Sequence, residues 1–244
     1  MEVTVLGSAA MYATTERACA GYLVELGTCR LWVDCGAGTW RNLLAHTDYR
    51  RLGGIVLTHR HPDHVSDVFQ AFHARQFGGT DPMATIPVWA PRETIERVTG
   101  YYRELDEGFE MNAVAEGDSV DVAGARVSFV RMAHPPETLG VRIENEGKVL
   151  AYSADSGPEA DFPALAGDAD LFVCEATMQD SDPLWEGHLS ASQAGAIAAR
   201  VGASRLVLTH LPADRDLDVS LKEARATCPD VPVELAHDGL RLEV

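Results

Sequence analysis

The chain has 244 residues, 46% of them hydrophobic and 23% charged, which is an ordinary globular composition with enough length to bury a sizeable core. Its 20 Lys and Arg against 37 Asp and Glu give a net charge of −17, which argues against a protein that grips long nucleic acid through its phosphates. No apolar run could span a bilayer, no targeting pattern is seen and the five cysteines form no CxxC pair, so we expect a cytoplasmic protein that binds no membrane.

In the first half of the chain, short apolar or alternating runs punctuated by glycine predict strands. These strands cover residues 1–7, 20–26, 29–36, 54–59 and 86–91. Between them, apolar residues at helical intervals predict three helices. These helices cover residues 39–53, 63–77 and 92–105.

The second half repeats this alternation. Two hairpins are predicted, turning at "AG" and at "NEG", over residues 118–134 and 139–155. The remaining strands and extended segments cover residues 170–177, 205–211 and 231–244. Two helices are predicted, the first opened by a serine cap and closed by glycine, at 190–202 and 218–228.

No low-complexity linker separates the two halves of the chain. Each half supplies strands and helices in the order required by two sheets that pack face to face with helices outside. We therefore expect a single domain over residues 1–244.

The stretch "THRHPDH", residues 58–64, lies between a predicted strand and a predicted helix. Residues at i and i+2 of an extended segment point the same way, so His59 and His61 can bind one ion together. Asp63 and His64 follow at the turn and the helix start, where their side chains can converge on a neighbouring point. Imidazole and carboxylate groups suit zinc, manganese or iron, so this stretch predicts a metal site.

Three further donors each end a predicted strand and precede a turn, namely His134, Asp155 and His210. With the histidine cluster they make five histidines and two aspartates, enough for two ions. A carboxylate that bridges two ions about 3.5–4 Å apart is typical of two-metal hydrolysis of phosphate esters.

The motifs "THRHPDH", His134, "YSADSG" and "LTHLP" resemble, in their order, those of the metallo-β-lactamase-fold hydrolases. The resemblance spans nearly the whole chain and implies an α/β (α+β) fold, a four-layer αββα sandwich with the site at one edge of its sheets. It implies that one divalent ion is held by His59, His61 and His134. It implies that the other is held by Asp63, His64 and His210, with Asp155 bridging the two.

The stretch "CEATMQDSDPLWEGHLSASQAG", residues 174–195, resembles the ribonuclease Z-like phosphodiesterase branch of this fold. In that branch a glutamate after a strand supports a later histidine, and here these are Glu175 and His188. When a metal-bound hydroxide attacks phosphorus, the departing alkoxide needs a proton, which a histidine held by a carboxylate can supply. The candidate catalytic residues are therefore Asp63, His188 and Glu175.

The substrate is expected to be small. The tRNA 3′-processing endonucleases of this branch carry a long arm between the third metal histidine and the bridging aspartate. Here only 20 residues separate His134 from Asp155, and the predicted hairpin uses nearly all of them. Short members without the arm resemble hydrolases of small phosphodiesters, in the first place 3′,5′-cyclic nucleotides. Relatives of this kind also make a homodimer an expectation.

Three alternatives remain at this point. A tRNA 3′-end endonuclease uses the same chemistry on a macromolecule. A thioester or lactone hydrolase of the same fold needs no acid for an alkoxide, so full activity of His188→Ala would favour it. A non-enzymatic nucleotide-binding module is disfavoured by the complete ligand set. The donors do not choose among zinc, manganese and iron.

Other polar and aromatic residues receive weaker assignments. Asp34 is expected to orient a ligand histidine or the backbone of "THRHPDH". His46 and His73 fall inside helical patterns and are not expected to be ligands, while His237 stays undecided. For several aromatic residues the simplest interpretation is a place in the core or at the rim of the site, although each could stack on a base. These are Tyr12, Trp40, Phe72, Phe77 and Trp185.

Overall fold

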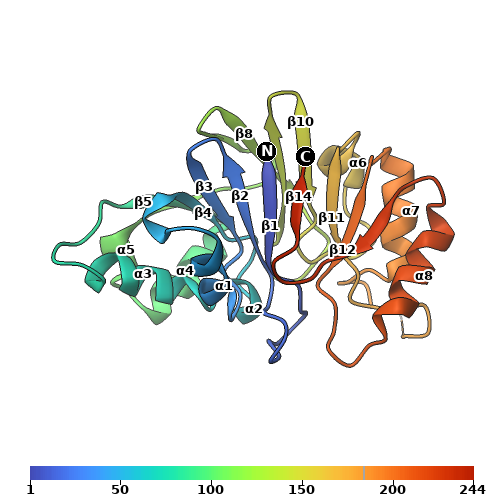
Figure 1. The fold of residues 1–244 in the computed structure, drawn as a ribbon, viewed down its shortest axis with the longest axis horizontal. Helices are drawn as coiled ribbons and strands as arrows, with labels where there is room; N and C mark the ends of the chain where they lie inside the picture. The colour runs from blue at the N-terminus through green and yellow to red at the C-terminus, as the bar shows by residue number, and fades with distance from the viewer. Residues whose placement is uncertain (184) are drawn as a thin grey trace.

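Two seven-stranded sheets pack face to face at the centre of the computed structural model, which describes residues 1–183 and 185–244 (Figure 1). The first sheet has the order β14 (Arg241–Glu243), β1 (Glu2–Gly7), β2 (Gly21–Leu26), β3 (Cys29–Val33), β4 (Leu52–Val56), β5 (Ile86–Ala90) and β6 (Phe109–Ala113). The second has the order β13 (Val233–Leu235), β12 (Leu206–Thr209), β11 (Leu171–Glu175), β10 (Lys148–Tyr152), β9 (Leu139–Asn145), β8 (Ala125–Arg131) and β7 (Ser119–Val122).

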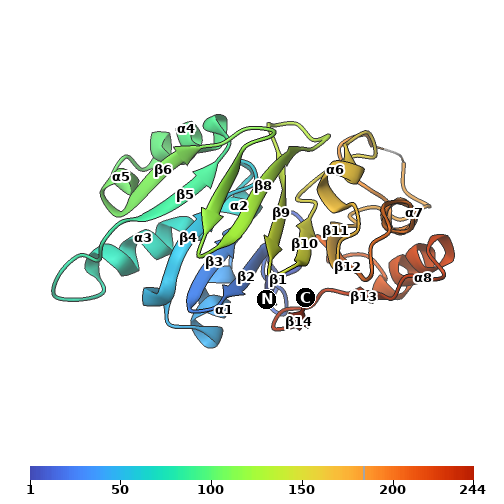
Figure 2. The same cartoon turned by 90° about the horizontal axis from the view of Figure 1, so that it is seen from above.

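Helices cover the outer face of each sheet, as the two views show (Figures 1 and 2). The first sheet is covered by α1 (Thr39–His46), α2 (Pro62–Val65), α3 (Val68–Phe77), α4 (Arg92–Tyr101) and α5 (Leu105–Gly108), with a short 3-10 helix at Tyr49–Arg51. The second is covered by α6 (Phe162–Ala166), α7 (Ala191–Val201) and α8 (Leu217–Thr227). The four-layer αββα sandwich is thereby confirmed.

The apolar core divides into three layers that follow from this arrangement. The central cluster lies between the sheets and joins residues such as Val24 of β2 to Phe129 and Val141 of β8 and β9. Two outer clusters lie between each sheet and its helices, around Phe72 on one side and Phe172 on the other. The sheet residues that separate these layers are buried on both faces, which explains their continuous apolar runs.

Two helices predicted from the sequence are shorter in the structure. The helix predicted over 39–53 ends at His46, because the side chain of Asp48 accepts a hydrogen bond from the backbone of Arg50 and opens the 3-10 turn. The helix predicted over 63–77 is divided at Asp67. Its carboxylate accepts a hydrogen bond from the backbone of Trp40 in α1, so a long-range contact, which no local pattern shows, accompanies the break.

Further differences concern short elements. The helix predicted over 92–105 ends at Tyr101. The five-residue elements β6 and α6 have too few residues to give a clear apolar period, so neither is predicted by the sequence. None of the helices in the described ranges is long and apolar enough to cross a membrane.

The loops that follow β3, β4, β8, β10 and β12 meet at one edge of the sandwich. Three non-glycine residues in these loops, Asp34, Ala154 and His210, have positive φ angles of 57°, 51° and 53°. Such a conformation is uncommon for non-glycine residues and concentrates at functional sites. This edge of the sandwich is therefore a candidate functional site.

Candidate metal centre

The loop after β4 is held between the two sheets. The backbone N–H of Thr58 donates to Asp34 Oδ1 at 2.8 Å, and the N–H of Leu139 on β9 donates to the carbonyl of Thr58 at 3.0 Å. His59 follows in this clamped segment and is fully buried. His61 is the N-cap residue of α2, whose first turn has Pro62 in the position that suits proline. The strand end and the helix start thus fix the two histidines.

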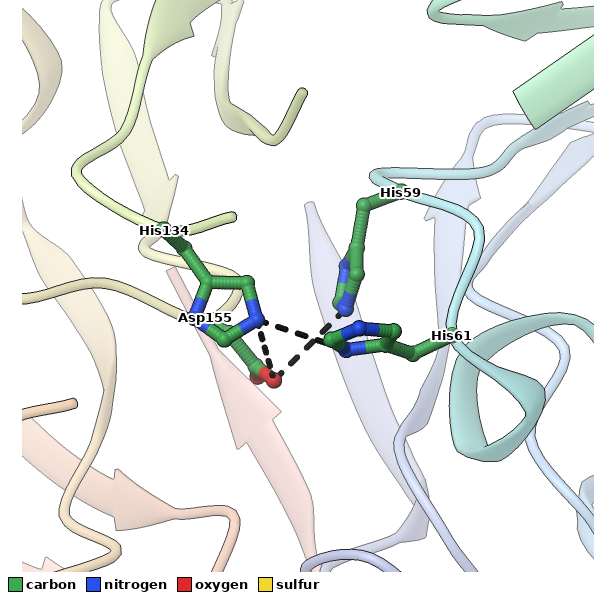
Figure 3. A group of neighbouring side chains, drawn as sticks. All are labelled: His59, His61, His134 and Asp155. Carbon is green, nitrogen blue, oxygen red and sulfur yellow. Dashed lines mark hydrogen bonds and ion pairs between the residues drawn. The ribbon is translucent and has the colours of Figure 1, made fainter. Parts of the chain in front are cut away.

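A first group of ligand atoms consists of His59, His61, His134 and Asp155, all within 4.8 Å of one another (Figure 3). Asp155 Oδ2 lies 3.6 Å from His59 Nε2 and 3.8 Å from His134 Nε2. His61 Nδ1 lies 3.3 Å from His134 Nε2. His61 therefore presents Nδ1 to the shared point, whereas the other two histidines present Nε2.

A second group consists of Asp63, His64 and His210, whose ligand atoms also lie within 4.8 Å of one another. His210 Nε2 lies 3.3 Å from Asp63 Oδ2. Asp155 Oδ1 lies 3.3 Å from His64 Nε2 and 3.4 Å from His210 Nε2. The two carboxylate oxygens of Asp155 thus face different groups, which is the placement that a bridging ligand requires.

Four of the five histidines are oriented through Nδ1 by a partner outside the groups. The Nδ1 contacts are His59 with Thr58 Oγ1 at 3.1 Å, His64 with Asp34 Oδ2 at 2.7 Å, His134 with the Gly187 carbonyl at 2.7 Å and His210 with Thr177 Oγ1 at 2.8 Å. A partner at one ring nitrogen sets the tautomer and the direction of the other. These contacts leave Nε2 of each ring for a metal.

The residues present fit divalent metal ions. Within residues 1–183 and 185–244, His59 Nε2, His64 Nε2 and Asp155 Oδ1 are buried and have no hydrogen-bond partner. Buried polar atoms without a partner are rare in folded proteins and call for an explanation. A cluster of such atoms that converge from imidazole and carboxylate groups is the donor set that zinc, manganese and iron accept.

The carboxylates and imidazoles of the two groups shift one another's pKa. Burial acts to raise the pKa of Asp155, but the imidazoles of His210 and His64 hold it well below its ordinary range. Burial likewise acts to lower the pKa of His64, yet the carboxylates of Asp155, Asp34 and Asp63 raise it well above its ordinary range. Ionised carboxylates therefore concentrate at this edge and attract positive charge.

Glu175 and His188 form an ion pair beside the two groups. Glu175, fully buried at the end of β11, accepts hydrogen bonds from the backbone of Ser156 at 2.7 Å and from the Thr177 hydroxyl at 2.8 Å. Its Oε1 also lies 2.7 Å from His188 Nδ1. Burial acts to lower the pKa of His188, but the Glu175 carboxylate raises that pKa to about 9. The ligand atom of His188 lies within 4.8 Å of those of Asp155 and His210.

Comparison with known proteins assigns the family. Residues 29–211 match the family model described as the beta-lactamase superfamily domain. The chain belongs to the beta-lactamase superfamily. The probable metallo-hydrolase YhfI of Bacillus subtilis (strain 168) is 31% identical over 244 residues, which cover 98% of both chains. The crystal structure of YhfI has a TM-score of 0.90 at 28% identity, covering 99% of this chain and 98% of that chain.

Two further superfamily relatives bear the ribonuclease Z name. Ribonuclease Z of Archaeoglobus fulgidus is 23% identical over 302 residues, covering 100% of this chain and 97% of its own. The crystal structure of human tRNase Z, short form, has a TM-score of 0.79 at 21% identity and covers 100% of this chain and 99% of that chain. The predicted place among metallo-β-lactamase-fold hydrolases, near the ribonuclease Z-like branch, is confirmed.

Three residues that contact this superfamily site lie outside the sequence predictions. The Tyr152 hydroxyl donates to Asp34 Oδ2 at 2.9 Å, and the backbone N–H of Met11 donates to Asp63 Oδ2 at 2.9 Å. Thr177 touches both His210 and Glu175. Tyr152 is three positions before Asp155, and Thr177 is two positions after Glu175. This closeness in sequence to predicted site residues is the one signal that could have indicated them. No sequence pattern around Met11 indicates a contact with Asp63.

The remaining sequence assignments can be placed as well. Asp34 contacts both His64 and Thr58, as expected of a residue that orients a ligand histidine and the metal-binding loop. His237 is exposed, and its Nδ1 faces the carbonyl of Asp238 at 3.2 Å. His46 lies 3.5 Å from an Arg241 guanidinium nitrogen, and His73 is exposed on α3. Neither of the two groups includes His237, His46 or His73.

Proposed function

We propose that this metal-dependent hydrolase of the beta-lactamase superfamily cleaves small phosphodiesters, with 3′,5′-cyclic nucleotides as the first substrates to test. The observation that carries the proposal is the Glu175–His188 ion pair beside the two groups of metal-ligand atoms. Hydrolysis of an alkyl phosphodiester expels an alkoxide, and the pair is the kind of proton donor that such a leaving group needs.

Two divalent ions, zinc in the first place and manganese or iron as alternatives, are proposed to occupy the site. His59, His61 and His134 would hold one ion, Asp63, His64 and His210 the other, and Asp155 would bridge them. Bound divalent ions lower the pKa of a coordinated water and neutralise charge on the phosphoryl oxygens.

Three side chains, those of His188, Glu175 and Asp63, are proposed to donate or orient the protons of the reaction. Because its pKa is raised, His188 carries a proton on both ring nitrogens at neutral pH, and its Nε2–H donates to the departing oxygen. Glu175 holds the ring through Nδ1 and stabilises its charge. Asp63, kept ionised by the imidazole of His64 despite its burial, accepts a hydrogen bond from the attacking water and orients it.

Two features support a small substrate. Residues 139–152, which are 14 of the 20 residues between His134 and Asp155, form the β9–β10 hairpin, whose tight turn at Glu146 and Gly147 has both φ angles positive. No segment is left there for an arm that would grip tRNA. The net charge of −17 also opposes binding of a long polyanion.

The relatives support the reaction class. YhfI is named a probable metallo-hydrolase, and it is similar over nearly the whole chain. The Archaeoglobus relative is named a ribonuclease, and ribonucleases cleave phosphodiester bonds. That second name also keeps tRNA processing as the competing candidate for this site.

The test measures turnover of 3′,5′-cyclic AMP and of a precursor tRNA by the metal-loaded enzyme, side by side. Asp155→Ala serves as the inactive variant, and Asp106→Ala, an exposed aspartate on α5, as the matched control. Cyclic AMP hydrolysis that survives Asp106→Ala and is lost in Asp155→Ala supports the proposal. Cleavage of the tRNA alone would replace it with the endonuclease, and inertness toward both would point to thioesters or lactones.

A further inference from the structure

The aromatic side chains that the sequence offers for stacking on a base have different surroundings in the structure. Phe72 is fully buried, and Trp40 packs between Trp32 and Tyr49. Phe77 is exposed at the end of α3, where its ring lies near those of Phe72 and His73. Trp185 differs from these three, because its ring contacts imidazoles of the candidate metal centre. Tyr12, the fifth candidate, is 53% exposed, and among the described residues no site imidazole lies against its ring. Trp185 is therefore the candidate that the ring contacts favour.

Trp185 lies against two histidines of the site. Its ring centroid is 4.8 Å from that of His188 and 5.7 Å from that of His134, with interplanar angles of 60° and 86°. Half of its side chain remains exposed, at 50%. An indole ring at the edge of a metal site thus keeps apolar surface available beside the proposed proton donor.

The position of Trp185 is built into the loop that also orients a metal ligand. A Cβ atom at Gly187 would come within 2.6 Å of the indole, so a side chain there would displace the ring from this position. The carbonyl of the same glycine faces His134 Nδ1 at 2.7 Å. One short segment therefore holds both the ligand histidine and the indole, which ties the ring to the geometry of the reaction centre.

We propose that Trp185 stacks on the planar base of the substrate and holds it on the side where the alkoxide departs. The proposal rests on the proposed phosphodiesterase function. The side follows from the contact with His188, since a group on the indole lies next to the proton donor. Stacking uses the π-face that every base has, so the enzyme should favour substrates with a base and discriminate weakly among bases.

The test compares two cyclic phosphodiesters that differ in the base alone: 3′,5′-cyclic AMP and the methyl riboside 3′,5′-cyclic phosphate. We expect Trp185→Ala to raise KM for cyclic AMP about tenfold, with kcat within about threefold, and to leave KM for the base-free analogue unchanged. Trp185→Phe, which keeps a stacking face, should stay within about threefold of wild type. Equal KM increases for both substrates, or none for either, would overturn the role of Trp185 while leaving the hydrolase function standing.

A binding measurement separates the two proposals. Trp185 is far more exposed than Trp32 and Trp89, which are 0% and 8% exposed, so its fluorescence should respond most to a stacked base. We expect 5′-AMP to quench the wild type and Trp40→Phe, but not Trp185→Phe, while ribose 5-phosphate quenches none of them. If this pattern appears and neither cyclic substrate is hydrolysed, the base site stands and the phosphodiesterase falls. If 5′-AMP quenches Trp185→Phe as it does the wild type, the base site falls.

Discussion

The hydroxyl group of Thr177 sets which ring nitrogen of His210 carries the proton. Thr177 Oγ1 lies 2.8 Å from Glu175 Oε2 and 2.8 Å from His210 Nδ1. Because a carboxylate can only accept, the hydroxyl donates to Glu175 and must accept from an N–H at His210 Nδ1. The lone pair of His210 therefore sits on Nε2, toward the second group. The same threonine touches the carboxylate that holds His188, so it connects a metal ligand to the proton donor.

Removal of this hydroxyl should weaken metal binding. We expect Thr177→Val, which keeps the branched shape, to lower zinc affinity about 10- to 100-fold because His210 loses its tautomer control. Competition with a chromophoric chelator measures the affinity. Thr177→Ser keeps the hydroxyl and should bind zinc like the wild type, whereas wild-type affinity in Thr177→Val would show that the hydroxyl does not orient His210.

His188 should matter for the leaving group more than for the metal. We expect His188→Ala to lower kcat about 10²- to 10⁴-fold on an alkyl phosphodiester. The loss should be much smaller on a p-nitrophenyl phosphodiester, whose leaving group departs without a proton. Metal content, measured by elemental analysis, should stay at the wild-type level. Equal losses on both substrates, or loss of metal, would argue that His188 has a structural role.

The candidate site residues could be predicted from the sequence for a local reason. His59, His61, Asp63 and His64 fall within seven consecutive positions, and the other donors each end a strand, so short patterns contain them. Their supporting partners come from elsewhere in the chain: the Gly187 carbonyl is 53 residues from His134. Such contacts depend on how distant loops pack, which no local pattern encodes.

Among the secondary-structure elements, α7 has a direct influence on the site. It starts three residues after His188 and is closed at its N-terminus by a reciprocal pair of hydrogen bonds between Ser190 and Gln193. The Gln193 side chain accepts from the Ser190 backbone at 2.8 Å, and Ser190 Oγ accepts from the Gln193 backbone at 3.3 Å. This capping box fixes where the loop that carries Trp185 and His188 must enter the helix.

Loss of the cap should destabilise the protein modestly. We expect Ser190→Ala to lower the free energy of unfolding by about 1 kcal/mol, which for a chain of this size shifts Tm by about 2–4 °C. Differential scanning calorimetry gives the shift. Ser190→Thr, which retains a capping hydroxyl, should fall between Ser190→Ala and the wild type, and an unchanged Tm in Ser190→Ala would show that the cap contributes little here.

The helix boundaries show where periodicity stops being informative. The serine and glycine that end α7 act on their own helix, and both were predicted from sequence. Asp67, in contrast, divides a helix-like run by a hydrogen bond to the backbone of Trp40, 27 positions away. Apolar spacing continues across that break, so the pattern predicted one helix where the packing requires two.

For the whole molecule, the site joins the two sheets. His59 and His61 follow a strand of the first sheet, whereas His134, Asp155 and His210 follow strands of the second. A bound ion would therefore link the halves of the sandwich, and ligands that bind the folded state alone add to its stability by mass action. The face-to-face sheets were predictable from the order of elements, but the pairing of β14 with β1 in the first sheet was not, because three residues carry little pattern.

Metal removal should lower thermal stability. Zinc at about 1,000 times its Kd adds about 4 kcal/mol, so we expect chelation to lower Tm by on the order of 10 °C. Calorimetry with and without chelator gives the difference. Asp155→Ala should lose the zinc-dependent part, and His73→Ala, an exposed histidine on α3, should keep it. An equal Tm of the wild type with and without zinc would contradict stabilisation by the ion.

The pairing of β14 with β1 has a consequence for biosynthesis. Residues 2–4 are synthesised long before their partners at 241–243. Until then one edge of β1 has exposed backbone hydrogen-bonding groups, the kind of edge that invites association with other chains. His210, also late in the chain, has to emerge before the second group of metal ligands is complete. Nascent chains should therefore remain accessible to chaperones until residues 241–243 are made, and unable to complete the second group of metal ligands until residue 210 is made.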